Sequence, residues 1–361
     1  MSHKSSEIRP SLYRRPLGQF NDLAHRFPDT KYMGSKRVLL PFILYHIEKL
    51  RFSRVLDAFS GSGCVAYALK NLGAEVHAND FLRFAFHTAK AVVENNATTL
   101  TEEEIALLLR KNPSAQTFIQ DKFHALYFEP ADNQFLDNLW ANLERLPSPM
   151  KRSLALAAAC RAAMKKRPRG IFTFTGKKGW DGRSDLRISM QDQFLRAVIL
   201  INNAVFSNKK RNRAIWGDVF EIDPKGYDIV YIDTPYISPF SDCDYTRRYH
   251  FVEGYCTYWE GVEILENTTT KKIRSYQTDF SSKDHAIESF NRLFEHFRKA
   301  KLVVSYSSTG IPSKEQMVKM LKQFKKSVTV QEIAHRYHHG NHRHKVGDNN
   351  NAVKEYLFIA V

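Results

Sequence analysis

Short apolar runs alternate with helically patterned segments over much of the chain. The runs that predict buried strands cover residues 54–59, 75–80, 213–218, 228–233 and 301–306. Residues 65–72 follow the first run after a glycine-rich turn, and their apolar positions recur with helical spacing. This alternation is typical of an α/β fold with a parallel sheet. Two more runs, residues 331–335 and 355–361, predict a closing antiparallel pair.

The alternation lapses between residues 97 and 212. The elements predicted there are an acidic helical stretch (101–146), a helix that starts at Ser148 and Pro149 and stops at Pro168 and Gly170, a β-prone stretch with glycine-rich turns (171–187), and a helix (191–206). We therefore predict a main domain of residues 1–96 and 191–361 that carries an inserted domain of residues 97–190.

The length of 361 residues fits a core domain with an insertion. The sequence has no apolar run long enough to span a bilayer, and its first residues lack the apolar segment of a secretory signal, so we expect a cytoplasmic protein. Its four cysteines form neither a C-x-x-C pair nor a zinc-ligand set, and we expect reduced, structural thiols.

Positive charge is concentrated in one part of the chain. The whole sequence has 54 Lys and Arg against 38 Asp and Glu, a net +16, and residues 151–213 hold 16 basic and 3 acidic residues, a net +13. Such a block attracts phosphate, which favours a nucleic-acid partner over an anionic membrane or a merely solvated surface. The candidate phosphate contacts are Lys165, Lys166, Arg167, Arg169, Lys177, Lys178, Arg183 and Arg187, with Arg247 and Arg248 as a second group.

A glycine-rich turn, DAFSGSG, joins the first predicted strand to its helix at residues 57–63. Glycines at such a bend let backbone N–H groups approach a ligand, and the helix N-terminus favours negative charge. An ordinary tight turn is the alternative interpretation. Asp80 ends the next strand, about 20 residues after these glycines, where a carboxylate commonly binds the ribose hydroxyls of a nucleoside.

The segment VYIDTPY, residues 230–236, places Asp233 at the carboxyl end of an apolar strand. Open α/β sheets bind their ligands at this edge. Pro235 fixes the turn that follows, and Tyr236 offers a flat aromatic face. A carboxylate, an available carbonyl and a stacking ring suit a planar base with an exocyclic amine, although a plain strand end is the alternative.

Together, KYMGSK, DAFSGSG, AND and IDTPY occur in an order that resembles the Dam-like N6-adenine DNA methyltransferases of the D12 class. The resemblance implies a Rossmann-like class I methyltransferase sheet, an inserted target-recognition lobe, and S-adenosylmethionine as cofactor. It implies that Tyr32 and Lys36 meet the methionine end of the cofactor and that Asp80 binds its ribose. The other cofactor-binding residues that it implies are Asp57, Phe59, Gly61 and Gly63 in the turn and Asp218 and Val219 at the adenine.

The same resemblance implies the catalytic residues Asp233, Thr234, Pro235 and Tyr236. The amine of adenine is a poor nucleophile, so two acceptors that hold its hydrogens help to localise its lone pair. Asp233 supplies one acceptor, and the carbonyl of Thr234 or Pro235 supplies the other, while a flipped adenine stacks on Tyr236. Thr234 departs from the family's Asp-Pro-Pro-Tyr, but a backbone carbonyl survives this exchange. The resemblance implies no metal. The histidines at 335, 338, 339, 342 and 344 are predicted to lie in a loop and not to form a metal site.

The expected partner is double-stranded DNA, with a restriction endonuclease or another defence protein as a further candidate. Methylation of adenine in RNA and a catalytically idle nucleic-acid-binding module are the alternatives, since phosphate attraction is common to all three. No cysteine follows a proline, which excludes the Pro-Cys nucleophile of C5-cytosine enzymes. Amino-cytosine methylation stays open, although an Asp rather than a Ser at position 233 favours adenine.

Overall fold

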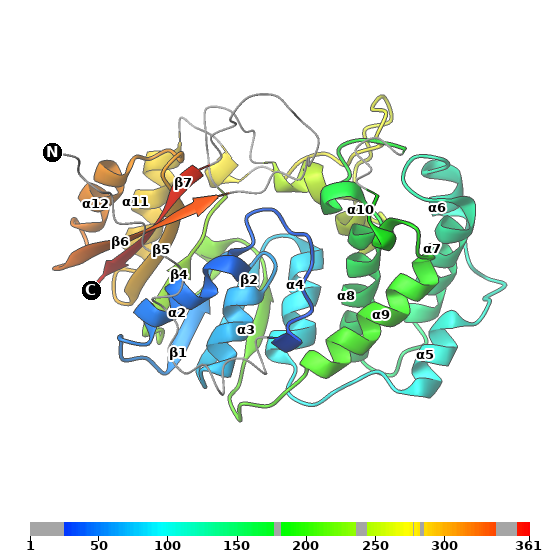
Figure 1. The fold of residues 1–361 in the computed structure, drawn as a ribbon, viewed down its shortest axis with the longest axis horizontal. Coiled ribbons are helices and arrows are strands. Elements are labelled where there is room, and N and C mark those ends of the chain that lie inside the picture. The colour runs from blue at the N-terminus through cyan, green and yellow to red at the C-terminus, as the bar shows by residue number, and fades with distance from the viewer. Residues whose placement is uncertain (1–24, 177–181, 236–243, 277, 282–284, 337–351) are drawn as a thin grey trace, which may run out of the picture.

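The computed structural model describes residues 25–176, 182–235, 244–276, 278–281, 285–336 and 352–361. These residues form a seven-stranded sheet with the order β3-β2-β1-β4-β5-β7-β6 (Figure 1). The strands are β1 (Arg54–Asp57), β2 (Glu75–Asp80), β3 (Arg213–Trp216), β4 (Ile229–Ile232), β5 (Lys301–Ser307), β6 (Val328–Arg336) and β7 (Ala352–Ala360). All neighbours pair in parallel except β7, which runs antiparallel to β5 and β6. The predicted strands and the closing antiparallel pair are thus confirmed.

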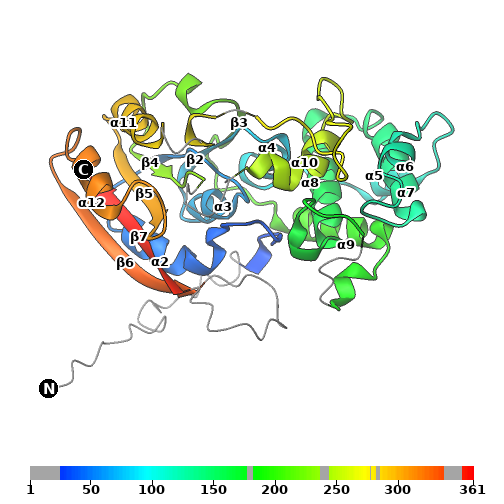
Figure 2. The ribbon, with the colours of Figure 1, turned by 90° about the horizontal axis from the view of Figure 1, so that it is seen from above.

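Helices cover both faces of this sheet, as Figure 2 shows. On one face lie α2 (Leu40–Ile47), α3 (Cys64–Asn71) and α4 (Arg83–Ala89), which continues as a π-helical turn (Lys90–Glu94), and on the other lie α11 (Ala286–His296) and α12 (Lys314–Leu321). Alternate residues of β4 show why both faces are apolar, because Tyr231 packs on the first face and Val230 and Ile232 on the second. Strands buried on both sides are the expected state of a parallel sheet.

A lobe of helices extends from one side of the sheet (Figure 1). Its helices are α5 (Glu102–Leu109), α6 (Phe118–Lys122), α7 (Pro130–Leu143), α8 (Pro149–Lys165), α9 (Met190–Ala204) and α10 (Tyr245–Tyr255). Ser148 caps α8 by accepting the N–H of Lys151, and Pro149 occupies the first turn, so the predicted helix start is confirmed. None of the helices in the described ranges has the length and apolar character to cross a membrane.

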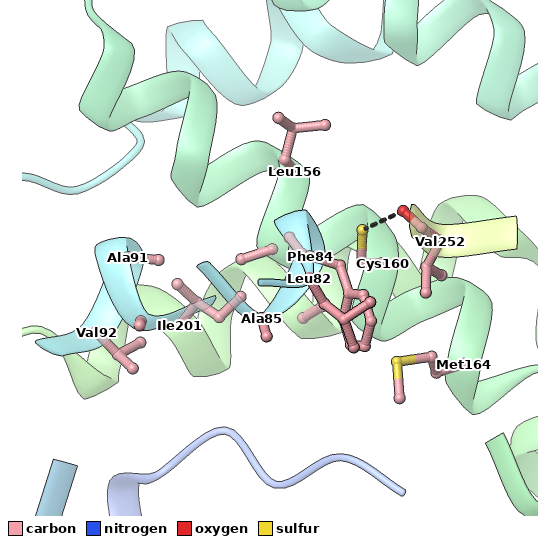
Figure 3. Packing of buried hydrophobic residues seen from close by; sticks show 14 of the residues in the cluster. Leu82, Phe84, Ala85, Ala91, Val92, Leu156, Cys160, Met164, Ile201 and Val252 are labelled. Atoms are coloured by element: carbon pink, nitrogen blue, oxygen red, sulfur yellow. Dashed lines mark hydrogen bonds between the residues drawn. The ribbon is translucent and has the colours of Figure 1, made fainter. Parts of the chain in front are cut away.

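The lobe shares one continuous apolar core with the sheet's first face. Figure 3 shows Phe84 of α4 beside Met164 of α8, and the Cys160 thiol of α8 lies 3.8 Å from the carbonyl oxygen of Val252 on α10. The helix α9, which we assigned to the main domain, packs along α8. The lobe therefore includes a helix from outside residues 97–190, and the division into two domains at these residues stays a prediction.

The β-prone prediction for residues 171–187 is wrong for the part of that stretch that the structure describes, which has no strand. Its backbone groups bond to side chains and helices instead. The N–H of Phe172 donates to the carbonyl of Arg248 on α10, and the Arg167 guanidinium donates to the carbonyls of Phe174 and Gly176. These partners satisfy the segment without a neighbouring strand.

Candidate active site

The glycine-rich turn after β1 bends where only glycine is comfortable. Gly61 has a φ of 50° and Gly63 a φ of 79°, in the left-handed region. A Cβ atom on Gly61 would lie 2.9 Å from the ring of Tyr32, so the missing side chain also lets Tyr32 approach. The N–H of Gly61 donates to Asp80 at 2.7 Å, which joins the turn to the end of β2.

Three carboxylates meet at this edge of the sheet, because β1, β2 and β4 are adjacent and parallel and end at Asp57, Asp80 and just before Asp233. Asp57 is 1% exposed, and neither of its side-chain oxygens has a well-formed hydrogen bond among the described residues. Burial raises its pKa, and the charges of Asp233 and Asp80 raise it further, against the lowering effect of nearby backbone N–H groups. The pocket is thus prepared for a cationic ligand.

Lys36 supplies a positive charge inside the same cavity. Its Nζ lies 2.9 Å from Oδ1 of Asp233, and the two side chains are 4% and 16% exposed. Burial by itself lowers the pKa of the Lys36 ammonium, but Asp233 and the buried Glu355 of β7 more than offset this and raise it. The structure therefore brings Lys36 of the KYMGSK segment and Asp233 of the IDTPY segment, about 200 residues apart in the chain, into direct contact.

Two connected cavities lie along this edge. The first, of about 60 Å³, is lined by Tyr32, Lys36, Asp57, Gly61, Asp80 and Asp233, among others. The second, of about 310 Å³, is lined by Asp218, Val219, Trp216, Tyr276 and Phe280, among others. Phe59, Phe81 and Pro235 line both. The cofactor residues that the sequence predicts therefore line one or the other cavity, apart from Gly63, which caps α3 behind the turn.

The second cavity has an aromatic rim that the sequence did not single out. The Arg83 guanidinium lies 4.4 Å from the centre of the Trp216 ring, and Trp216 donates its indole N–H to the Phe81 carbonyl. Arg83 also donates to Tyr276 at 2.8 Å and pairs with Glu253 of α10. Burial raises the pKa of Glu253 to about 7.

Of the predicted catalytic residues, the structure describes three. Thr234 is 3% exposed, and Pro235 faces both cavities. Tyr236 lies outside the described residues. Two tyrosines that sequence reasoning missed, Tyr245 and Tyr249 on α10, stack on Tyr32 with ring centres 5.7 Å and 5.1 Å away. Their spacing by four residues indicates one helical face, but α10 lies outside the motifs, so nothing in the sequence connects this face with the site.

Two of the predicted DNA contacts, Arg167 and Lys166, bind partners within the lobe. Arg167 is 1% exposed, and its guanidinium donates to backbone carbonyls, including that of Phe174, so it holds the loop after α8 together. The Nζ of Lys166 lies 2.6 Å from Asp132, with both side chains 8% exposed. Neither cation presents a free charge to phosphate in this structure, and the role of this pair in DNA binding stays a prediction.

The other basic candidates differ in their surroundings. Lys165 and Arg183 both lie near Asp185, at 3.5 Å and 3.8 Å, while Arg169 and Arg187 are exposed. Lys177 and Lys178 lie outside the described residues, as do the histidines from 338 to 344. Among the residues that the structure describes, no cluster of His, Cys, Asp or Glu has the geometry of a metal site. The cysteines 64, 160 and 256 are buried free thiols.

The sheet order, the glycine turn and the carboxylates at the strand ends are typical of an α/β protein of the nucleotide-binding kind. The model of the D12 class N6 adenine-specific DNA methyltransferases matches residues 32–320, and the chain belongs to this family. It is accordingly an adenine-specific DNA methyltransferase with a class I methyltransferase fold.

Curated relatives agree with this assignment. The type II methyltransferase M2.HphI of Haemophilus parahaemolyticus is 26% identical over 332 residues, which cover 86% of this chain and 93% of that protein. The modification methylase StsI of Streptococcus sanguinis is 26% identical, and the type II methyltransferase M.FokI of Planomicrobium okeanokoites is 25% identical. Each match covers 91% of this chain, which spans about half the length of these two proteins.

Proposed function

We propose that the chain transfers a methyl group from S-adenosylmethionine to the N6 amine of an adenine flipped out of duplex DNA. The observation that carries this proposal is the ion pair between Lys36 and Asp233, which joins the KYMGSK segment to the end of β4 inside one cavity. S-adenosylmethionine supplies a methyl group on a positively charged sulfur, and its sulfonium and ammonium groups match a pocket rich in carboxylates.

The residues present fit this cofactor. The carboxylate of Asp57, buried and without a well-formed hydrogen bond, is suited to an ammonium group beside Tyr32. Asp80 accepts the N–H groups of Gly61 and Leu82 at 2.7 Å and 2.9 Å, which fixes its carboxylate and leaves acceptor capacity for two ribose hydroxyls. Asp218 and the backbone of Val219 are placed in the larger cavity to bind the adenine moiety.

Asp233 and Thr234 carry the amine chemistry in this proposal. The carboxylate of Asp233 accepts one hydrogen of the N6 amine, and the carbonyl of Thr234, held by a buried side chain ahead of Pro235, accepts the other. The lone pair of nitrogen is thereby drawn out of the ring and becomes available for attack. Lys36 fixes the orientation of the carboxylate through its ion pair. Methylation leaves a surplus proton on nitrogen, and Asp233 is the nearest base.

The DNA face lies on the lobe that begins after β2. A target base stacked in a duplex cannot reach the edge of the sheet unless it is flipped out, and we assign its stacking partner to Tyr236. The exposed Arg169 and Arg187 are the phosphate contacts that the described residues support best, with Lys177 and Lys178 proposed from the sequence. Lys165 and Arg183 can join them where DNA competes for Asp185.

Transfer of labelled methyl groups tests the proposal directly. Purified protein with labelled S-adenosylmethionine is expected to label unmethylated genomic DNA on adenine N6. RNA is expected to stay unlabelled, and so is DNA taken from cells that already express the protein. Nucleoside analysis by mass spectrometry identifies the modified base. Label on cytosine N4 would contradict the adenine assignment, and label on RNA alone would contradict the DNA assignment.

Cofactor affinity is expected to depend on pH through Asp80. Burial raises the pKa of this carboxyl to about 6, even though the N–H groups of Leu82 and Gly61 lower it. Because the ionised form accepts the ribose hydroxyls, affinity is level above pH ~7 and falls by up to ~10-fold for each unit below ~6. Calorimetric titration with S-adenosylhomocysteine measures this. Burial also raises the pKa of the Asp57 carboxyl, so the Asp80→Asn variant is used to isolate the share of Asp80. A level affinity down to pH ~5 in the wild type rules the mechanism out.

The names of the relatives suggest the biological setting. All three are called modification methylases or type II methyltransferases, which are terms of restriction–modification. We propose that the present chain works in the cytoplasm and protects DNA from a restriction endonuclease that cuts at the same site.

A further inference from the structure

The segment from Asp29 to Lys36, called here the cofactor loop, lies between the glycine turn of the sheet and the helices of the lobe. On the sheet side, Gly61 lies directly under the ring of Tyr32. On the lobe side, three separate elements contact the loop's backbone. The lobe residues that make these contacts lie outside the motifs, and the proposed function does not explain their contacts with the loop.

The first two contacts come from α8 and the turn that follows it. Arg161 of α8 is 8% exposed and donates from Nε to the carbonyl of Asp29 at 3.1 Å. Gly170 packs so tightly on Lys31 that a Cβ atom would lie 2.5 Å from the Lys31 carbonyl oxygen. The loop's first half is therefore positioned by the lobe rather than by the sheet.

The third contact comes from α10. The N–H of Met33 donates to the hydroxyl oxygen of Tyr249 at 2.7 Å, and the hydroxyl of Tyr245 donates to the Met33 carbonyl at 3.3 Å. The Tyr249 ring is fully buried and lies nearly parallel to that of Tyr32, at an interplanar angle of 3°. One side chain thus holds both the backbone and the aromatic ring of the loop.

The same helix is anchored in the lobe. The carbonyl of Arg248 accepts the N–H of Phe172 at 2.9 Å, and the ring of Phe251 stacks on that of Phe172 with centres 5.1 Å apart. Phe172 follows the turn that holds Gly170 and Arg169. If DNA displaces this turn, the contacts between Phe172 and α10 would transmit the movement to Tyr249. The contacts of Tyr249 with Met33 and Tyr32 would then transmit it to the cofactor loop.

We propose that Tyr249 is a positioning residue that fixes the cofactor loop and couples cofactor binding to the DNA lobe. This inference rests on the proposed function, because it assigns the loop to cofactor binding. Coupling of this kind is reciprocal, so DNA bound to the lobe changes cofactor affinity by the same factor by which cofactor changes DNA affinity.

The variant Tyr249→Phe removes the hydroxyl and keeps the ring. It leaves the N–H of Met33 without its acceptor, so the Kd for S-adenosylhomocysteine is expected to rise by ~5–10-fold. The KM for S-adenosylmethionine rises by the same factor, whereas kcat at saturating cofactor and the Kd for DNA in the absence of cofactor change less than about twofold. The ratio of cofactor Kd values with and without DNA moves towards one.

Tyr255→Phe is the matched control. Tyr255 lies on the same helix, is 1% exposed and donates its hydroxyl to the Leu136 carbonyl inside the lobe, away from the loop. It is expected to lower the melting temperature without changing the KM for cofactor. If Tyr249→Phe does not fold, Tyr245→Phe, which removes the longer bond to Met33, should show a smaller rise in the same KM.

The outcomes separate the two proposals. A wild type that binds S-adenosylhomocysteine, together with a Tyr249→Phe variant that binds it equally well, overturns the positioning role and leaves the proposed function intact. Equal losses in Tyr249→Phe and Tyr255→Phe also overturn it, since they show a general effect of a lost buried hydroxyl. A wild type without affinity for the cofactor overturns both proposals.

Discussion

Asp233→Asn is expected to lower kcat for DNA methylation by ~10²–10⁴-fold while cofactor and DNA still bind. Asparagine has the size of aspartate, but its amide bears no charge, so it is a weaker acceptor for the amine hydrogen and no base for the surplus proton. It also ends the ion pair with Lys36. Single-turnover methyl transfer at saturating DNA and cofactor measures the chemical step.

The matched control is Asp228→Asn, the same exchange at the opposite end of the same strand. Asp228 accepts the backbone N–H groups of Ser53 and Arg54 at 2.7 Å and 2.9 Å and lies outside both cavities. Hydrogen bonds from these groups lower its pKa, so the variant is expected to lose stability and to keep kcat. If Asp233→Asn keeps more than about a tenth of the wild-type kcat, Asp233 does not carry the amine chemistry.

The sequence was sufficient to predict the sheet and the position of the motifs, because both depend on local patterns. Buried parallel strands read as short apolar runs, and Asp57, Asp80 and Asp233 each stand at or beside the end of such a run. Neighbouring strands then bring these residues together whatever the loops between them do. The family resemblance rests on the same motifs and implies the same positions.

The lobe could not be predicted in the same way, because its basic residues have two incompatible uses that share one sequence pattern. Arg167 lies in the run KKRPR, which is typical of a phosphate-binding surface, yet its guanidinium is buried among backbone carbonyls. The backbone carbonyls of Tyr127 and Phe174 accept hydrogen bonds from this guanidinium. Tyr127 is distant in the sequence and Phe174 lies in an irregular segment, so the pattern around Arg167 does not predict these contacts. Tyr249 was missed for a related reason, since its partner Met33 lies 216 residues away.

Gly170→Ala is expected to destabilise the protein and to displace the cofactor loop. Gly170 has a φ of 75°, and an L residue in that region loses ~1 kcal/mol or more of stability. The added Cβ would also lie 2.5 Å from the Lys31 carbonyl oxygen, which is backbone and must move. Overpacking of this kind costs a further ~1–3 kcal/mol. We expect a lower melting temperature and a weaker affinity for S-adenosylhomocysteine.

Gly182→Ala separates the two causes. Gly182 lies in the same lobe with a φ of 77°, and a Cβ atom there would meet no atom of the described residues within 4 Å. Both variants bear the conformational strain, but Gly170→Ala alone displaces the cofactor loop. The melting temperature should therefore fall further in Gly170→Ala, and the cofactor Kd should rise in that variant only. An equal Kd in the two variants means that cofactor binding tolerates a displacement of the loop at Lys31. The lobe would then position the cofactor loop through Arg161 and Tyr249.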